Sequence, residues 1–244
     1  MSVKRKKKIS SFDFQPGRVV ARKYQVISQL GEGWEGEVYL LKEIMTGIER
    51  AGKVFYPHRN IHNRAFKFYA KKLHKLRNCP IIIQYHTQET MTVRGIPITV
   101  LISEYVQGEL LDNFLKRQPG RRLQVFPGLH LLHALASGIE KIHSLGEYHG
   151  DLHSENIIVR RYGLSFDLRL VDLYQWHDPR PENIRDDVCS MIRIFYDAIG
   201  GEKFYHKQPQ VVKDICCGLK QSLIWKKFKT AGQLREYLET MTWE

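Results

Sequence analysis

The sequence lacks the features of a membrane-spanning, secreted or disulfide-stapled protein. Its longest apolar run, Ile96 to Ile102, is interrupted by Pro97 and Thr99 and is far shorter than the roughly 20 residues that cross a bilayer. The basic start, Lys4 to Lys8, is followed by polar residues where a signal peptide would need an apolar stretch. The four cysteines have spacings that suit neither a bridge nor a metal site, which indicates reduced thiols. We therefore expect a cytoplasmic protein with no transmembrane segment.

The chain also lacks internal repeats and any long linker rich in Pro, Gly or Ser. Its 244 residues suit one domain with a substantial core. With 43% hydrophobic and 26% charged residues, the composition is that of a globular protein and excludes extended disorder. We expect a basic, disordered tail over residues 1–18 and a single domain over residues 19–244.

Acidic residues are missing from two stretches of a chain whose net charge is +12. Residues 1–8 carry five basic residues and residues 50–88 carry nine, with no Asp or Glu in either stretch. Such blocks favour an anionic partner: a nucleotide, a nucleic acid, an acidic protein or a membrane surface. A solvated basic helix face explains the second block equally well.

Short β-type runs fill the first hundred residues, and helical periodicity dominates the remainder. The expected strands are Tyr24 to Leu30, Gly36 to Leu41, Arg50 to Phe55 and Ile98 to Ser103. One amphipathic helix with a basic face is expected at about residues 63–77. This pattern predicts an α+β fold with a small β-rich lobe (19–104) and a larger, mainly α-helical lobe (105–244). Any ligand is expected in the cleft between them.

Three glycines, Gly31, Gly33 and Gly36, lie between two predicted strands in a G-x-G-x-x-G-x-V pattern that ends at Val38. A dinucleotide-binding fold would need a helix after the third glycine, whereas the residues that follow have the pattern of a strand. A glycine loop joining two strands can approach phosphate oxygens closely, because glycine has no Cβ. Taken alone, the triad also fits an ordinary hairpin turn.

A polar loop and a later strand end carry the strongest signal. Asp151 and Asn156 are five positions apart in the loop, and Asp172 follows a short apolar run. Phosphoryl transfer needs a carboxylate that orients and deprotonates the attacking hydroxyl, together with oxygen ligands that hold magnesium against the phosphates. These three residues are the right types for both tasks.

The glycine loop, Lys53 in the next predicted strand and the Asp-Asn-Asp set occur in the order found in the protein-kinase-like superfamily, which the chain resembles from about Tyr24 onward. The resemblance implies that Asp151 is the catalytic base and that Lys53 clamps the phosphates of ATP. It implies that Asn156 and Asp172 bind Mg²⁺. The further ATP-binding residues that it implies are Gly31, Gly33, Gly36, Val38, Ala51, Glu104, Val106 and Ile158.

The resemblance also implies structural roles for two other positions. Asp187 is similar to the aspartate that opens the central helix of the large lobe and braces the catalytic loop. His149 matches a position that supports loop structure, which disfavours a zinc site built from His143, His149 and His153.

The pattern departs from the family in several places. The helix after Lys53 has no acid to pair with that lysine, and we suggest Glu35, Glu37 or Asp172 as the substitute. Asp187 follows Asp172 by only fifteen positions, which implies a shortened activation segment. The loop begins His-Gly-Asp where protein kinases have His-Arg-Asp, and His153 replaces their lysine. The resulting His-Gly-Asp-Leu-His resembles aminoglycoside phosphotransferases.

Three functions follow as expectations. The first is an ATP- and Mg²⁺-dependent protein serine/threonine kinase, because the glycine loop and residues 227–234 resemble a compact bacterial kinase domain. The second is a small-molecule kinase of the aminoglycoside or choline type. The third is a pseudokinase that acts as a nucleotide-binding scaffold, favoured by the missing helix acid and by Asp-Leu-Tyr at 172–174 in place of Asp-Phe-Gly.

Overall fold

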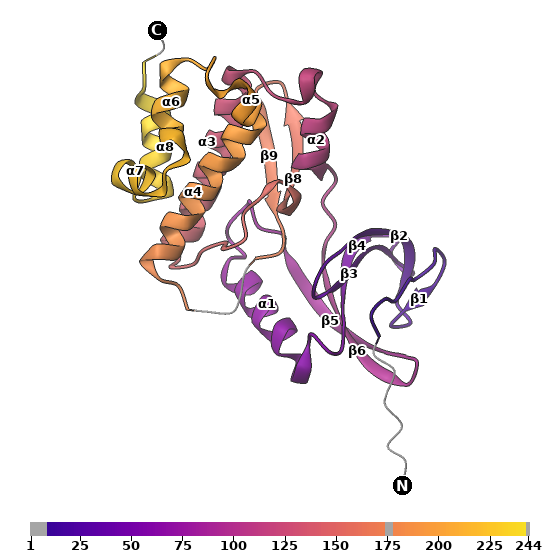
Figure 1. Cartoon of the computed structure of the whole chain (residues 1–244). Helices are drawn as coiled ribbons and strands as arrows, with labels where there is room; N and C mark the ends of the chain where they lie inside the picture. Colours follow the sequence, from indigo (N-terminus) through magenta and orange to yellow (C-terminus); the bar gives the residue numbers. More distant parts are fainter. Residues whose placement is uncertain (1–8, 174–177, 243–244) are drawn as a thin grey trace. The chain divides into compact units, whose positions relative to one another are not determined.

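The computed structural model describes residues 9–173 and 178–242, which form two compact units (Figure 1). The first unit takes in the chain up to Arg77 together with Ile83–Val106, and the second takes in Asn78–Ile82 and the chain from Gln107 onward. The first is rich in strands and the second in helices, so the expected α+β fold is confirmed. The basic residues 4–8 and Tyr174 lie outside the described residues.

Six antiparallel strands form the sheet of the first unit, in the order β1-β2-β3-β4-β6-β5. They are β1 (Val19–Val20), β2 (Tyr24–Glu32), β3 (Gly36–Glu43), β4 (Glu49–Phe55), β5 (Tyr85–Val93) and β6 (Ile96–Glu104). The four strands expected from the sequence lie within β2, β3, β4 and β6, so these predictions are confirmed. β5 is missing from the expectations because this edge strand is mostly polar, and only its last residues, Met91 and Val93, alternate as apolar side chains.

One helix, α1 (Arg64–Lys75), accompanies this sheet and confirms the expected amphipathic helix. Phe66, Tyr69 and Leu73 are buried on one side, whereas Lys67 and Lys71 are exposed on the other. A basic face therefore exists on α1. The anionic partner suggested for it stays a prediction.

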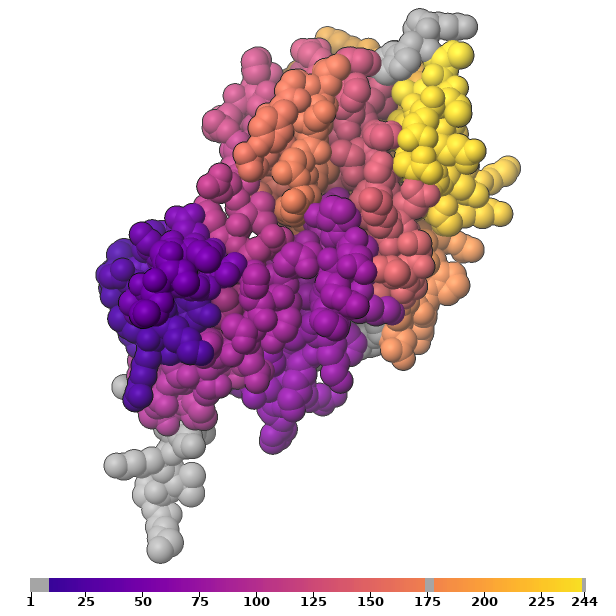
Figure 2. Space-filling model, turned by 180° about the vertical axis from the view of Figure 1, so that it is seen from behind, coloured from indigo at the N-terminus to yellow at the C-terminus, as the bar shows by residue number. Residues whose placement is uncertain are grey.

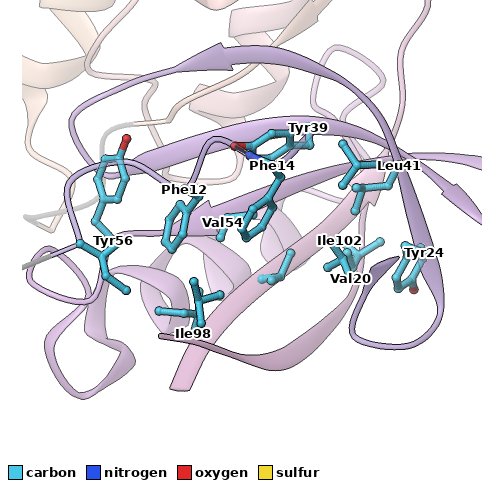
Figure 3. Close-up of a cluster of buried hydrophobic side chains, with 14 residues drawn as sticks. Phe12, Phe14, Val20, Tyr24, Tyr39, Leu41, Val54, Tyr56, Ile98 and Ile102 are labelled. Carbon is cyan, nitrogen blue, oxygen red and sulfur yellow. Dashed lines mark hydrogen bonds between the residues drawn. The ribbon is translucent and has the colours of Figure 1, made fainter. Parts of the chain in front are cut away.

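The segment Ile9–Phe14, which we call the N-terminal strap, packs into the core of the first unit. Ile9, Phe12 and Phe14 are each less than 5% exposed. They join the buried side chains of the sheet in one hydrophobic cluster (Figure 3). This differs from the expected tail over residues 1–18, because three apolar side chains of that range are buried under the sheet.

Helices dominate the second unit, around the long helix α3, eight of whose 20 residues are buried. The helices are α2 (Leu111–Arg117), α3 (Val125–Ser144), α4 (Pro181–Ala198), α5 (Gly201–Tyr205), α6 (Gln210–Cys216), α7 (Gln221–Lys227) and α8 (Ala231–Thr240). Short 3-10 turns occur at η1 (Ile61–Asn63) in the first unit and at η2 (Pro119–Arg121), η3 (Ser154–Asn156) and η4 (Cys217–Leu219) in the second. α3 packs against α4 and α8, and the C-terminal helices (yellow) cover one side of the unit (Figures 1 and 2).

A three-stranded sheet lies beside α3, in the order β7 (Glu109–Leu110), β8 (Ile157–Tyr162), β9 (Ser165–Leu170). The segment 78–82 belongs to this unit because the Leu170 amide donates to the carbonyl of Ile81 over 2.7 Å. Gly138 of α3 admits the side chain of Ile81, since a Cβ there would lie 2.2 Å from its Cδ1 atom. The β8 and β9 ends adjoin the polar loop singled out by the sequence.

No helix among the described residues is both long and apolar enough to cross a bilayer. The four cysteines are free thiols. Burial raises the pKa of the Cys216 thiol to about 12, so this thiol stays protonated and packs as a small apolar side chain.

Candidate functional site

The glycine loop joins β2 to β3, and its three glycines have different surroundings. The Gly33 amide donates to the Gly36 carbonyl over 2.9 Å and closes the turn. A Cβ on Gly36 would lie 2.1 Å from the Val54 carbonyl oxygen, so only glycine fits there. Gly31 and Gly33 have no neighbouring atom within 4 Å of such a Cβ. Gly36 is therefore required by packing, while Gly31 and Gly33 leave open space along the loop backbone.

Lys53 in β4 forms an ion pair with Glu35 of the glycine loop. The Nζ atom of Lys53 lies 3.0 Å from Oε2 of Glu35, and the two side chains are only 11% and 15% exposed. The same Nζ lies 4.9 Å from the centre of the Tyr69 ring in α1. Among the suggested substitutes for the absent helix acid, Glu35 is the one that pairs with Lys53 inside this unit.

The contact between Tyr69 and Lys53 could not be predicted from the sequence pattern. The place of Tyr69 in the apolar stripe of α1 identified it only as a core residue, and the ring is indeed 2% exposed. The face of the Tyr69 ring is also the part of α1 that contacts the Lys53 ammonium. The aromatic quadrupole therefore interacts with Lys53 on the helix where the resemblance implies a carboxylate.

We expect Glu35→Gln to weaken the binding of an ATP analogue with Mg²⁺ by about tenfold, because a charge-assisted hydrogen bond in a partly dry site contributes roughly 1.5 kcal/mol. The neutral amide no longer fixes the ammonium of Lys53. Isothermal titration calorimetry measures the change, and Glu32→Gln, on an exposed acid of the same loop, is the matched control. Tighter binding by Glu35→Gln would show instead that the ion pair obstructs the nucleotide.

The other first-unit residues implied for ATP binding share one sheet face with Lys53. Val38 pairs with Lys53 in the β3–β4 register, and Ala51 lies two residues before Lys53 on the same strand. Because side chains alternate along a strand, all three point to the face opposite the core that contains Tyr39. Val38, Ala51 and Lys53 are half-buried, as a ligand-binding surface would be.

The end of β6 carries the two remaining first-unit residues, Glu104 and Val106. The Glu104 carboxylate accepts a hydrogen bond from the Gln84 amide over 2.9 Å, and the Glu104 amide donates to the Gln84 carbonyl at the same distance. These bonds fix the strand end just before the chain passes into the second unit. Val106 is half-buried, and Ile158 lies in β8 of the second unit.

Asp151 and Asn156 lie together in the polar loop of the second unit. The Asn156 side chain is buried, and its Nδ2 donates to the Asp151 carbonyl over 2.9 Å and to Oδ2 of Asp151 over 3.2 Å. The Asp151 side chain is 58% exposed. Asn156 thus orients the Asp151 carboxylate, and the exposure of that carboxylate leaves it accessible to a reactant.

Asp172 is placed by its neighbour Val171. The Val171 amide donates to the Asn156 carbonyl over 3.0 Å, and Nε2–H of His149 donates to the Val171 carbonyl over 3.1 Å. These bonds bring the backbone before Asp172 to the loop that carries Asn156. Asp172 itself has a left-handed backbone with φ of 53°, which is costly for a non-glycine residue. The role predicted for Asp172 in binding Mg²⁺ stays a prediction.

Asp187, in the second turn of α4, holds the start of the polar loop. Its carboxylate is 1% exposed and accepts hydrogen bonds from the amides of His149 over 2.7 Å and Gly150 over 2.9 Å. Nε2 of His143 lies 3.1 Å from the same carboxylate. The bracing role implied for Asp187 agrees with these contacts. Gly150 has a φ of 81°, which explains why a residue without Cβ precedes Asp151.

The three histidines that would have formed a zinc site have separate neighbours. His143 faces Asp187, His149 faces Val171, and Nε2 of His153 lies 3.7 Å from Oδ2 of Asp151. Across residues 9–173 and 178–242, no group of three or more His, Cys, Asp or Glu side chains is arranged to hold a metal ion. The histidines therefore serve the loop's hydrogen bonding.

The sequence is similar to known protein kinases. The protein kinase domain family matches residues 24–174. Serine/threonine-protein kinase pkn2 of Myxococcus xanthus is 30% identical over 162 residues, which cover 63% of this chain and 18% of that protein. Serine/threonine-protein kinase PknG of Mycobacterium leprae is 26% identical over 65% of this chain and 20% of its own length. The chain thus spans about a fifth of these relatives.

Solved structures show the same fold. The kinase domain of Mycobacterium tuberculosis PknI superposes with a TM-score of 0.64 at 18% identity, covering 93% of this chain and 97% of that domain. The kinase domain of PF14_0431 gives a TM-score of 0.61 at 19% identity, covering 78% of this chain and 68% of that one. Since the family match spans more than half of the sequence and includes the glycine loop, Lys53, Asp151, Asn156 and Asp172, the chain belongs to the protein kinase family.

Proposed function

We propose that this chain is an ATP- and Mg²⁺-dependent phosphotransferase that acts on serine or threonine hydroxyls of proteins. The observation that carries the proposal is the braced polar loop, in which Asn156 orients an exposed Asp151 carboxylate while Asp187 fixes the loop backbone. The names of the relatives favour a protein acceptor. The likeness of His-Gly-Asp-Leu-His to small-molecule kinases stays a prediction.

Asn156 and Asp172 fit a magnesium ion because both side chains carry oxygen atoms of the kind that this ion prefers. The Nδ2 group of Asn156 is used on Asp151, which leaves its Oδ1 as the atom able to bind a cation. Asp172 adds a carboxylate, and Mg²⁺ prefers such oxygen ligands. When bound, the ion neutralises charge on the phosphates.

The remaining chemistry belongs to the side chains. Asp151 orients the acceptor hydroxyl and takes its proton as the hydroxyl oxygen bonds to the γ-phosphorus. The bond between that phosphorus and the β–γ bridging oxygen breaks, and ADP leaves. Lys53 holds the α- and β-phosphates. The loop backbone at Gly31 and Gly33 covers these phosphates, because no protein atom fills the space beside the two glycines.

The test is incubation of the full chain with γ-labelled ATP and Mg²⁺ in three parallel reactions: alone, with casein and histone as general protein acceptors, and with choline and aminoglycosides. Label on serine or threonine of protein, removed when Mg²⁺ is chelated, supports the proposal. Label only on the small molecules would assign the second function, and ATP binding without transfer to any acceptor would assign the scaffold.

A further inference from the structure

A buried carboxylate joins the N-terminal strap to the strand that leaves the glycine loop. Glu37 directly follows Gly36 and is 1% exposed. It lies on the sheet face opposite Lys53, because side chains alternate along β3 and Val38 shares the face of Lys53. Two strap amides donate to it, from Phe12 to Oε1 over 2.8 Å and from Asp13 to Oε2 over 3.3 Å.

Two tyrosine hydroxyls complete the shell of this carboxylate. The Tyr56 hydroxyl donates to Oε1 of Glu37 over 2.9 Å, and the Tyr39 hydroxyl donates to Oε2. Burial by itself would raise the pKa of Glu37, but the hydrogen bonds from the two tyrosines and the two amides outweigh it and lower the pKa. No cation forms an ion pair with Glu37 within the described part of the chain. Four donors therefore stabilise a buried negative charge.

Aromatic packing holds the strap against the same two tyrosines. The Phe12 ring stacks on Tyr56 with centroids 5.4 Å apart, and the Phe14 ring stacks on Tyr39 at 5.2 Å. Figure 3 shows these rings in one cluster with Val54 and Ile98. The Phe14 amide also donates to the Tyr39 hydroxyl over 3.1 Å. The strap thus uses both its side chains and its backbone.

The same residues reach the glycine loop. The Tyr56 amide donates to the Glu35 carbonyl over 2.9 Å, next to the carboxylate that pairs with Lys53. Tyr56 therefore bonds to the residue before Gly36 through its backbone and to the residue after it through its hydroxyl. The strap, Glu37, Tyr56 and the loop form one continuous set of contacts.

We propose that Glu37 is a positioning residue that fixes the N-terminal strap to β3 and thereby holds the glycine loop in the conformation that receives the phosphates of ATP. This proposal rests on the proposed function, since the loop must bind ATP for its position to matter. Glu37 touches no reactant in this scheme. It acts through Gly36, whose close approach to Val54 transmits any shift of β3 to the loop.

The test is Glu37→Gln in the full chain. The side-chain NH₂ group of the glutamine would take the place of one carboxylate oxygen. In place of Oε2 it would face the Asp13 amide and the Tyr39 hydroxyl. In place of Oε1 it would face the Phe12 amide and the Tyr56 hydroxyl. We expect the affinity for ATP with Mg²⁺ to fall about tenfold while the affinity for adenosine stays within about twofold, because adenosine has no phosphates for the loop to contact. A merely structural role would weaken both ligands alike and overturn the proposal.

Glu43→Gln is the matched control, because it makes the same change at the far end of β3, where Glu43 pairs with Arg50. It should leave both affinities unchanged. Tyr56→Phe is a milder variant that keeps the ring stack on Phe12, and it should reduce ATP affinity about threefold, again without affecting adenosine. If Glu37→Gln does not fold, this variant decides the question.

Hydrogen exchange of the nucleotide-free protein separates this inference from the proposed function. Glu37→Gln should speed exchange at the amides of both the strap and residues 31–36, whereas Glu43→Gln should not. Faster exchange in the strap alone, with the loop unchanged, would overturn the coupling. Failure of the wild-type chain to bind ATP would refute the proposed function while leaving the exchange result interpretable.

Discussion

Asp151→Asn should lower the rate of phosphotransfer by roughly 10²–10⁴-fold, the range typical of a lost general base, while ATP affinity stays within about twofold. Asparagine keeps the shape of the side chain, so Asn156 still has an oxygen to contact. The amide cannot accept the proton of the acceptor hydroxyl at neutral pH. The 58% exposure of the Asp151 side chain places it where an incoming hydroxyl can reach it, so the effect falls on turnover and not on folding.

Single-turnover transfer from γ-labelled ATP measures this loss, with calorimetry reporting nucleotide affinity in parallel. Asp112→Asn on α2 is the matched control, since Asp112 pairs with the exposed Lys116 one helical turn away, and such pairs contribute little to stability. A variant at Asp151 that keeps more than about a tenth of the wild-type rate would exclude this residue as the base.

Asp187→Asn should lower the free energy of unfolding by about 3 kcal/mol, because a buried carboxylate that accepts two backbone hydrogen bonds is replaced by an amide that can accept at only one atom. For a domain of this size such a loss corresponds to a fall in Tm of roughly 6–12 °C. Since the two amides belong to His149 and Gly150, the polar loop should loosen first. Turnover is expected to fall at temperatures well below the melting transition.

Thermal unfolding followed by circular dichroism measures the change. Asp186→Asn is the control one residue earlier on α4. Burial, and after it the charges of Asp187 and Glu182, raise the pKa of Asp186, so the folded protein disfavours the charged form there. Removing that charge should leave stability unchanged or slightly higher near neutral pH, because a raised carboxyl pKa in the folded state costs stability above the unfolded-state pKa. Equal losses from both variants would contradict a specific role for Asp187.

Local patterns predicted much of this fold because most elements bury one face. Apolar residues in β2, β3, β4, β6 and α1 alternate or repeat with the period of each element, so the sequence predicts all five. β5 could not be predicted from the sequence, because an edge strand needs few apolar residues. The N-terminal strap is not predictable for another reason. Ile9, Phe12 and Phe14 follow a basic run and show no periodicity. Only the tertiary fold supplies the surface that buries them.

The choice between Glu35 and Glu37 shows what sequence alone cannot decide. The two acids flank Gly36, and either was a reasonable partner for Lys53. Their faces differ because Glu37 is already in the alternating register of β3, beside Tyr39, whereas Glu35 precedes the strand. A shift of one residue in the register of β3 would turn Glu37 to the sheet face that carries Lys53. Register is set by pairing with β4, which a local pattern does not contain.

The N-terminal strap also affects where this domain can be cut. The family match begins at residue 24, so a truncation guided by it would discard Ile9, Phe12 and Phe14. The shortened chain would leave the Glu37 carboxylate without two of its donors and would expose the aromatic faces of Tyr39 and Tyr56 to solvent. Exposed apolar patches of this kind promote aggregation. Recombinant versions of the domain should therefore start no later than Ile9, and insolubility of a shorter one would reflect a missing part of its core.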